Sequence, residues 1–285
     1  MPSAKVLLLG ANGNISLEVQ RQLSGNDSFS YVTISSDELN QIRESTKGLS
    51  CKVLELLADN PELPLWIFNA CGITNPQASL AELYSANVSL NLEIASLLCL
   101  GKVRLVTIGT VMERFPKMCN SNAYLHSKLK SQMELSQNKL NGHLHVRLHT
   151  LYGGRKMHSH MFLSQLFNAI ANDSDFVMTE GTQFREYHHV EDDVALILRM
   201  MLSETFGTVE VSSGNPITLI ELATEIFKRL LPERNIITSL ENNPREIFNF
   251  KYPRLQSFDG LPIHFRDSIE GIISYFQRFG TIIES

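Results

Sequence analysis

A tyrosine and a lysine four residues apart are the side chains of this chain best suited to acid–base chemistry. Tyr124 and Lys128 begin a stretch, residues 124–140, that has a helical pattern. Residues four apart share one face of a helix, so the phenol and the ammonium are expected side by side. A neighbouring cation favours phenolate and lowers the pKa of a phenol from about 10. Such a pair can protonate a carbonyl oxygen or remove a proton. The same Tyr-x-x-x-Lys spacing also occurs on solvated helix faces. Whether this pair is functional therefore depends on the motifs around it.

A turn with two glycines follows the strand predicted over residues 6–9. It reads Gly10-Ala-Asn-Gly13-Asn-Ile-Ser16 and leads into a helix predicted over 15–23. A glycine at a strand end permits a tight turn, and a second lets the main chain approach a pyrophosphate at the helix N-terminus. The spacing differs from Gly-x-Gly-x-x-Gly, and a plain strand–helix turn would also fit. Its position after the first strand favours dinucleotide binding.

The end of the second predicted strand, residues 31–34, bears on the choice of cofactor. Ser35, Ser36 and Asp37 follow it. An acidic residue directly at this strand end favours NAD, whereas a serine can hydrogen-bond the 2′-phosphate of NADP. We therefore expect NADP, with NAD as the alternative. Ser36 or Asp37 could equally cap the next helix.

Apolar strands alternate with helices through the first half of the chain. Strands are predicted over residues 6–9, 31–34, 65–69, 103–108 and 145–148, and helices over 15–23, 37–44, 80–100 and 124–140, with a short apolar run at 53–57. This alternation is typical of an α/β fold, a Rossmann-type doubly wound parallel sheet covered on both faces.

The pattern becomes less regular after Tyr152, which indicates a smaller C-terminal α/β lobe. Helices are predicted over residues 218–231 and 266–279, with a strand at 236–240. We expect residues 1–155, with 186–212 returning to them, to form the NAD(P)-binding domain. Residues 156–185 and 213–285 are expected to form the substrate-binding lobe.

Composition limits the classes of partner. The 285 residues are 43% hydrophobic and 19% charged, with a net charge of -5. A mildly acidic chain without a Lys/Arg-rich run disfavours nucleic acid. No stretch is expected to span a membrane, and the N-terminus reads as a strand. Four scattered cysteines indicate free thiols in the cytoplasm. No metal site is expected: His143, His145 and His149 alternate on a predicted strand as solvated or singly hydrogen-bonded imidazoles.

Longer motifs resemble those of the extended short-chain dehydrogenase/reductase family, the NAD-dependent epimerases, dehydratases and 4-ketoreductases of nucleotide sugars. Residues 69–72 (NACG) and 87–88 (NV) resemble cofactor-lining motifs of the family. Residues 147–153 (RLHTLYG) resemble RxxNVYG, and 213–223 resemble GxxxxxTxxELA at the start of the substrate lobe. Residues 185–195 (REYHHVEDDVA) resemble RDFIHVxDVA, the most specific of these segments. The resemblance runs over most of the chain.

The resemblance implies which residues form the site. Tyr124 is the expected proton donor, and Lys128 tunes it and holds the nicotinamide ribose. The residues expected to line NAD(P) are Gly10, Asn12, Gly13, Asn14, Ile15, Ser35, Ser36, Asn69, Ala70, Cys71, Gly72, Thr107, Tyr124 and Lys128. Those expected to bind a nucleotide-sugar substrate are Thr110, Thr150, Tyr152 and Arg185. A surface ion pair is the alternative for Arg185.

The chain departs from the family pattern on the strand before the tyrosine. Aligning Val111 with the family's valine puts Ile108 where the catalytic Ser or Thr stands. We expect Thr110 to supply the missing hydroxyl, with Thr107 as the alternative. Gly109-Thr110 replaces the Asp-Glu pair of the family's dehydratases, which disfavours elimination.

Two charged pairs near these motifs have plainer interpretations. Glu113 and Arg114 are expected to form a solvated loop pair after the strand. Asp192 and Asp193 are expected to cap and orient the following helix and not to act as an acid–base pair.

Three functions are consistent with these features. The leading hypothesis is an NAD(P)H-dependent reductase of a keto group on a nucleotide-activated deoxysugar. The nearest alternative is an epimerase that holds NAD tightly, and the third is a non-catalytic NAD(P)-binding regulatory protein. The helices at 80–100 and 124–140 could pair two copies in a homodimer, or simply cover the sheet.

Overall fold

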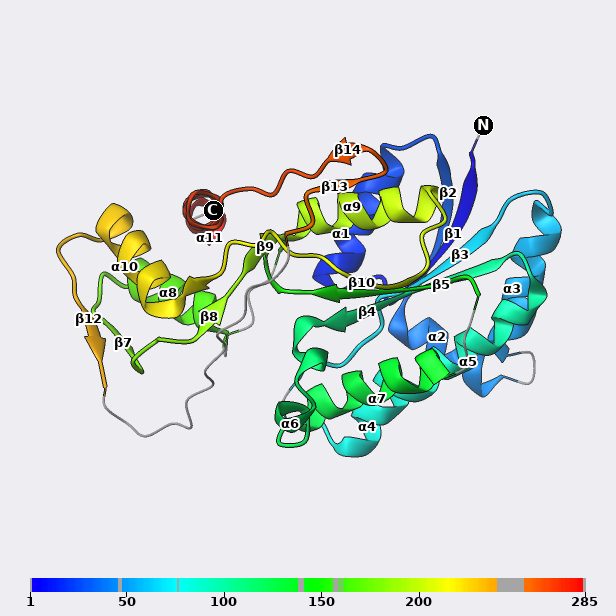
Figure 1. Cartoon of the computed structure of the whole chain (residues 1–285), viewed down its shortest axis with the longest axis horizontal. Helices are drawn as coiled ribbons and strands as arrows, with labels where there is room; N and C mark the ends of the chain where they lie inside the picture. The colour runs from blue at the N-terminus through cyan, green and yellow to red at the C-terminus, as the bar shows by residue number, and fades with distance from the viewer. Residues whose placement is uncertain are drawn as a thin grey trace. The chain divides into compact units, whose positions relative to one another are not determined.

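The computed structural model describes residues 2–45, 48–75, 77–137, 141–155, 159, 161–239 and 254–283 (Figure 1). The chain forms two units: Met1–Leu148 with Val194–Val211, and His149–Asp193 with Ser212–Ser285. Residues 149–155, 186–193 and 212, which were expected in the nucleotide-binding domain, belong to the second unit. The reason is that β6 (Thr150–Tyr152) pairs with β9 (Tyr187–His189) there.

The first unit is built on a six-stranded parallel sheet in the order β10-β5-β4-β3-β1-β2. The strands are β1 (Ala4–Leu9), β2 (Phe29–Ile34), β3 (Leu65–Asn69), β4 (Val103–Thr110), β5 (His143–Leu148) and β10 (Gly207–Glu210). Because β2 and β3 pair with opposite edges of β1, the strand order reverses at β1. Ligands of such sheets bind at the carboxyl ends beside this switch point. The predicted Rossmann-type fold is confirmed.

Helices cover both faces of this sheet (Figure 1). One face carries α1 (Asn14–Ser24) and the part of α9 (Val190–Leu202) that belongs to this unit; the other carries α2 (Ser36–Glu44), α3 (Gly48–Asp59), α5 (Leu90–Ser96) and α7 (Ala123–Gln137). The strands therefore need apolar side chains on both faces. Leu7 and Ile67 of the sheet, for example, share one buried cluster with Val53 and Ile94 of the helices.

Two helices differ from the expectation. The apolar run at 53–57 lies inside α3, where Leu49, Val53 and Leu56 are buried at helical spacing. The helix predicted over 124–140 begins at Ala123 and continues to Gln137; residues 138–140 lie outside the described part of the chain. Periodicity, and not apolar content alone, separates strand from helix at these places.

The stretch Leu80–Leu100 is helical throughout but changes its winding. It consists of α4 (Leu80–Tyr84), a π-helical turn η1 (Ser85–Ser89), α5 and a 3-10 turn η2 (Leu97–Leu100). By length and composition it could cross a membrane, contrary to the expectation that no stretch reaches that length. Leu90 and Ile94 are buried in the cluster that contains the sheet residues. A helix in a protein core can have the same length and apolar composition as a membrane span.

The second unit combines short strand pairs with helices α8 (Phe162–Ala171), α10 (Leu219–Leu230) and α11 (Ser268–Ile283). β7 (Phe176–Met178) pairs in parallel with β12 (Ile236–Thr238), and β8 (Phe184–Arg185) pairs antiparallel with β11 (Ile217–Thr218). β13 (Ser257–Phe258) and β14 (Leu261–Pro262) form a hairpin. Both predicted helices and the predicted strand are present, and Leu240 lies outside the described residues. The core is rich in aromatic side chains.

Candidate active site

The loop predicted to bind phosphate follows β1 and touches the end of β3. Gly10 has a φ of +86°, in the left-handed region that favours glycine. A Cβ on Gly10 would lie 2.9 Å from both the main-chain nitrogen and the sulfur of Cys71. Ser16 Oγ donates a 2.5 Å hydrogen bond to the carbonyl oxygen of Gly10. Glycine and serine thus allow the main chain to turn tightly against the neighbouring strand end.

The tip of this loop is accessible and leads into the first turn of α1. Asn12 and Gly13 are exposed, Gly13 is the N-cap of α1, and Asn14 and Ile15 are half-buried. The first N–H groups of a helix have no partners within the helix and attract anions. At the switch point of a parallel sheet, this arrangement fits the pyrophosphate of a dinucleotide. The assignment of these residues as ligands stays a prediction.

The serines after β2 have different environments. Ser35 is the N-cap of α2, and its Oγ accepts a 3.2 Å hydrogen bond from the main-chain N–H of Glu38. Ser35 is therefore the cap, where the sequence suggested Ser36 or Asp37. Ser36 contacts the thiol of Cys71, whose pKa is raised by burial. Ser36 thus lies beside the loop after β3, at the carboxyl ends of the strands, where the cofactor is expected.

Buried amides hold the loop after β3, residues 70–73. Asn69 is 3% exposed, and its Oδ1 accepts a 3.0 Å hydrogen bond from the main-chain N–H of Cys71. Its Nδ2 donates to Asn91 Oδ1 of α5 at 2.7 Å. The side chain of Asn69 is therefore used inside the protein, and Ala70, Cys71 and Gly72 present their main chain at the strand end.

Asn87 connects this loop to the helix that carries the tyrosine and lysine. Its Oδ1 accepts from the main-chain N–H of Ile73 at 3.1 Å, and its Nδ2 donates to Ser127 Oγ of α7 at 2.9 Å. A Cβ on Gly72 would lie 3.2 Å from Asn87 Oδ1 and 3.4 Å from Lys128 Nζ. The ammonium of Lys128 therefore lies directly against the loop after β3.

Tyr124 and Lys128 occupy successive turns of α7, and both are half-buried. Lys128 Nζ donates a 2.9 Å hydrogen bond to the carbonyl oxygen of Ile108. Burial lowers the pKa of Lys128, and the charge of Glu113 opposes that shift. Burial and the same carboxylate raise the pKa of Tyr124 to about 12. The expectation that the pKa of Tyr124 is lowered is therefore wrong: loss of solvent and a nearby anion keep the phenol protonated.

Ile108 and Thr110 share one face of β4. Both are partly exposed, whereas Thr107 and Gly109 are buried, as expected from the alternation of side chains along a strand. Thr110 Oγ accepts a 3.4 Å hydrogen bond from Met112 N and begins the 3-10 turn η3 (Val111–Arg114). A hydroxyl that accepts one bond still has its own proton to donate. A catalytic role of Thr110 stays a prediction.

Thr107 faces the interior of the first unit. It is 1% exposed, and its Oγ1 lies 2.8 Å from His143 Nε2 and 2.8 Å from His145 Nδ1. The two imidazoles occupy its hydrogen-bonding positions, which argues against Thr107 as a cofactor ligand or as the replacement catalytic hydroxyl. His143 and His145 are themselves buried and not solvated, and burial lowers the pKa of His143 to about 3.

Glu113 is buried, contrary to the expectation of a solvated loop residue. It is 2% exposed, so the expected solvated pair with Arg114 is wrong. Arg114 instead pairs with Glu210 at 3.0 Å. Burial alone would raise the pKa of Glu113, but the hydrogen bonds from His145 and the Thr110 main chain, together with the charges of His145 and Lys128, lower it. The sequence around Glu113 gave no signal of this burial, because its side-chain partners His145 and Arg147 lie on β5.

The residues predicted to bind substrate belong to the second unit, apart from Thr110. Thr150 begins β6, and Arg185 ends β8, where its Nη1 donates to the carbonyl oxygen of Phe184 at 2.9 Å. Tyr152 is 3% exposed and packs its hydroxyl against Gly271 of α11. Among the described residues, that hydroxyl has no hydrogen-bond partner. Tyr152 is a core residue covered by α11, and its role as a substrate ligand stays a prediction.

A buried histidine between two carboxylates is a second feature that the sequence did not reveal. His188 is 2% exposed; its Nδ1 lies 3.0 Å from Asp193 Oδ1 and its Nε2 lies 3.0 Å from Glu186 Oε2. Burial opposes the charged imidazole, but the bonds to these carboxylates raise the pKa of His188 to about 9. Asp192, the neighbour of Asp193, accepts from the main-chain N–H of Arg266. From the first turn of α9, Asp193 therefore contacts His188 of β9, and Asp192 contacts the segment before α11 at Arg266.

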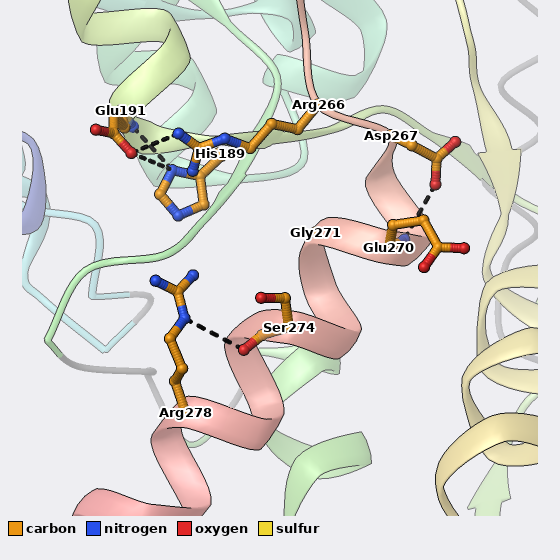
Figure 2. Close-up of a pocket in the computed structure, with 8 residues that line it drawn as sticks. All are labelled: His189, Glu191, Arg266, Asp267, Glu270, Gly271, Ser274 and Arg278. Carbon is orange, nitrogen blue, oxygen red and sulfur yellow. Dashed lines mark hydrogen bonds and ion pairs between the residues drawn. The ribbon is translucent and has the colours of Figure 1, made fainter.

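A surface pocket of about 600 Å³ lies in the second unit. Figure 2 shows His189 and Arg266 on one side of it and Ser274 and Arg278 of α11 on the other. Arg266 is paired there with Glu191. The pocket contains none of the residues predicted to bind substrate. Within the described ranges, no group of three or more His, Cys, Asp or Glu residues could hold a metal ion.

The sequence matches the model of one protein family, described as the NAD dependent epimerase/dehydratase family, over residues 6–211. That range includes the loop after β1, the end of β3 and the Tyr124–Lys128 pair. The chain belongs to this family. It is therefore an NAD(P)-dependent enzyme of the extended short-chain dehydrogenase/reductase type.

Solved structures of nucleotide-sugar enzymes share the whole fold. A dTDP-4-dehydrorhamnose reductase from Bacillus anthracis, in complex with NADP, is 18% identical, with a TM-score of 0.74 over 98% of this chain and 99% of that chain. A UDP-N-acetylglucosamine 4-epimerase from Methanobrevibacter ruminantium is 16% identical, with a TM-score of 0.72 over 100% of both chains. A dTDP-glucose 4,6-dehydratase from Bacillus anthracis, in complex with NAD, is 14% identical, with a TM-score of 0.68 over 99% of this chain and 98% of that chain. No curated protein sequence matches the chain.

Proposed function

We propose that the protein is an NAD(P)H-dependent reductase that acts on a keto group of a nucleotide-activated deoxysugar. The observation that carries the proposal is the Tyr124–Lys128 pair, a phenol that keeps its proton beside an ammonium bonded to the Ile108 carbonyl. Reduction of a carbonyl needs an acid that protonates the oxygen as hydride arrives. The dTDP-4-dehydrorhamnose reductases among the structural relatives support this direction of reaction.

The residues of the first unit suffice for the acid–base part of this reaction. When bound, the nicotinamide supplies the hydride. Tyr124 donates its phenolic proton to the substrate oxygen, and Lys128 stabilises the phenolate that remains. Thr110 adds a hydrogen bond to the oxygen as negative charge develops on it. Gly109 and Thr110 offer no carboxylate for elimination, which argues against a dehydratase.

The cofactor proposed is NADP in preference to NAD. The positive φ of Gly10 and its approach to Cys71 leave room for main chain only, which fits a pyrophosphate-binding turn. Ser35 is engaged as a helix cap, so Ser36 is the serine left to meet a 2′-phosphate. Relatives occur with either dinucleotide. Titration of the protein's fluorescence with NADPH and NADH decides between them, and tighter binding of NADH would overturn the preference.

Substrate binding is assigned to Thr110, Thr150 and Arg185. Thr150 stands where the family's motif has asparagine, and Arg185 stands where it has the arginine that meets the nucleotide or diphosphate. Tyr152 stays a predicted ligand, although it is buried under α11. A cytoplasmic location and a homodimer formed through the helices at 80–100 and 123–137 belong to the same proposal.

The test is a direct assay with a matched pair of variants. NADPH consumption is followed with a panel of nucleotide-linked 4-keto-6-deoxysugars. Tyr124→Phe is expected to lower kcat by about 10²–10⁴-fold, because the acid is lost. Tyr31→Phe, which removes a phenol bonded to Ser24, is expected to leave kcat unchanged. No consumption with any sugar at high enzyme concentration, or full activity of Tyr124→Phe, contradicts the proposal. NAD that co-purifies, with sugar isomers formed without net consumption, indicates the epimerase instead.

A further inference from the structure

Glu113 makes hydrogen bonds to two neighbouring strands of the sheet, β4 and β5. Its Oε1 accepts from the main-chain N–H of Thr110 on β4 at 3.0 Å. Its Oε2 lies 2.8 Å from His145 Nε2 and 3.1 Å from Arg147 Nε, both on β5. Its side chain is fully excluded from solvent. A carboxylate taken out of water is retained only where such partners compensate it.

The interior around Glu113 is shaped for this carboxylate. A Cβ on Gly109 would lie 2.6 Å from Glu113 Oε1 and 2.4 Å from His145 Nε2. Glycine at this position therefore leaves the space that the carboxylate and the imidazole occupy. Thr107 continues the chain of contacts, because its Oγ1 lies 2.8 Å from the other nitrogen of His145. The carboxylate of Glu113 is thus a buried group that bonds to residues of both β4 and β5.

The charge of Glu113 acts on both functional groups of α7. It raises the pKa of Tyr124 in addition to burial, and it opposes the lowering of the pKa of Lys128 by burial. The titratable and charged groups around the carboxylate are Tyr124 and Lys128 from α7, His145 and Arg147 from β5, and Cys119 from α6 (Pro116–Cys119). An anion held here disfavours phenolate and favours ammonium.

We propose that Glu113 is a positioning residue for the Tyr124–Lys128 pair: its buried carboxylate fixes the end of β4 at Thr110 and places a fixed negative charge near both side chains. This inference rests on the proposed reduction for its purpose, since a reductase starts its cycle with the acid protonated. The carboxylate itself has no contact with substrate in this proposal. Its effect passes through the main chain of Thr110 and through its charge.

The experiment removes the charge and keeps the shape. Glu113→Gln retains an oxygen that can accept from the Thr110 N–H. The phenolate of Tyr124 is titrated by ultraviolet difference spectra between each protein and the same protein with Tyr124→Phe, read directly after rapid pH jumps, before unfolding. We expect a midpoint near 12 in the wild type. In Glu113→Gln the midpoint is expected about one pH unit lower. The alkaline limb of the kcat profile is expected to move by the same amount.

Glu210→Gln is the matched control, because it removes a carboxylate of the same unit that is paired with Arg114. It is expected to leave the midpoint unchanged. Equal midpoints in the wild type and Glu113→Gln, or an equal shift in Glu210→Gln, overturn the proposal. Should Glu113→Gln fail to fold, the wild-type titration still decides: a midpoint near the ordinary value of about 10 overturns it. The titration needs no substrate, so absence of reductase activity with a shifted midpoint refutes the proposed function alone.

Discussion

The ammonium of Lys128 donates a hydrogen bond to the main-chain carbonyl of Ile108, the residue expected from the sequence to replace the family's catalytic serine or threonine. The bond uses the backbone of residue 108 and not its side chain. The orientation of Lys128 is therefore independent of which side chain stands there. Position 108 can accept a hydroxyl without loss of the lysine contact.

Ile108→Thr is expected to raise kcat for the proposed reduction by about 10-fold. The added hydroxyl can donate to the substrate oxygen as it gains negative charge, and single donors of this kind are worth about 10²–10³-fold in well-placed sites. Thr110 already covers part of this role in the proposed mechanism, hence the smaller gain. Ile108→Val is the control, because it has the branched shape of threonine without the hydroxyl. Equal rates for the two variants would show that no donor is missing.

Gly10→Ala is expected to destabilise the first unit and weaken dinucleotide binding. Its positive φ strains any L side chain, and the new Cβ would meet Cys71 at 2.9 Å. Gly101→Ala is the control, because Gly101 has a φ of +75° and nothing within 4 Å of its Cβ. It is expected to cost only about 1 kcal/mol. Urea unfolding and NADPH titration measure both variants; equal losses would show that contact with Cys71 is unimportant.

The stability of the second unit is expected to fall as pH rises above neutrality. The pKa of His188 is raised from 6.5 to about 9 by Asp193 and Glu186. A raised folded-state pKa stabilises the fold fully below pH 6.5, and this contribution is lost as pH rises through about 9. Its size is on the order of 3 kcal/mol. Urea unfolding of the wild type between these pH values measures the loss.

Two histidine variants separate this effect from general alkaline destabilisation. His188→Gln removes the imidazolium, so it is expected to lose stability at neutral pH and to show a flatter pH dependence. His264→Gln changes an exposed histidine of the same unit and is expected to retain the wild-type slope. A wild-type slope in His188→Gln would contradict the assignment of the pH dependence to this residue.

The sheet and the local motifs were predictable because their signals lie within short stretches of sequence. The turn at Gly10 depends on residues next to it, and Tyr124 and Lys128 share a helix face by spacing alone. Helical periodicity could also have identified α3, because Leu49, Val53 and Leu56 are three or four residues apart. The apolar content of the run at 53–57 hid that signal.

The buried polar contacts were not predictable, because their partners are far apart in sequence. Glu113 reaches His145 and Arg147, which lie 32 and 34 positions later. Only the register of β4 against β5 brings them together, and the sequence shows no such register. The burial of Tyr152 was not predictable for a similar reason, since Gly271 of α11 covers it from 119 positions away. Burial of a polar residue is a property of the assembled core and not of its neighbours in sequence.

The space above Gly109 also limits how this enzyme can change during evolution. The family's dehydratases carry an aspartate at this position, but here any side chain would collide with His145 and Glu113. Gain of that acid requires both side chains to move or to change, and loss of either one removes one hydrogen-bond partner of the other inside the core. Gly109→Asp alone is therefore expected to disturb the packing of His145 and Glu113. A change at position 109 therefore depends on how His145 and Glu113 are packed against it.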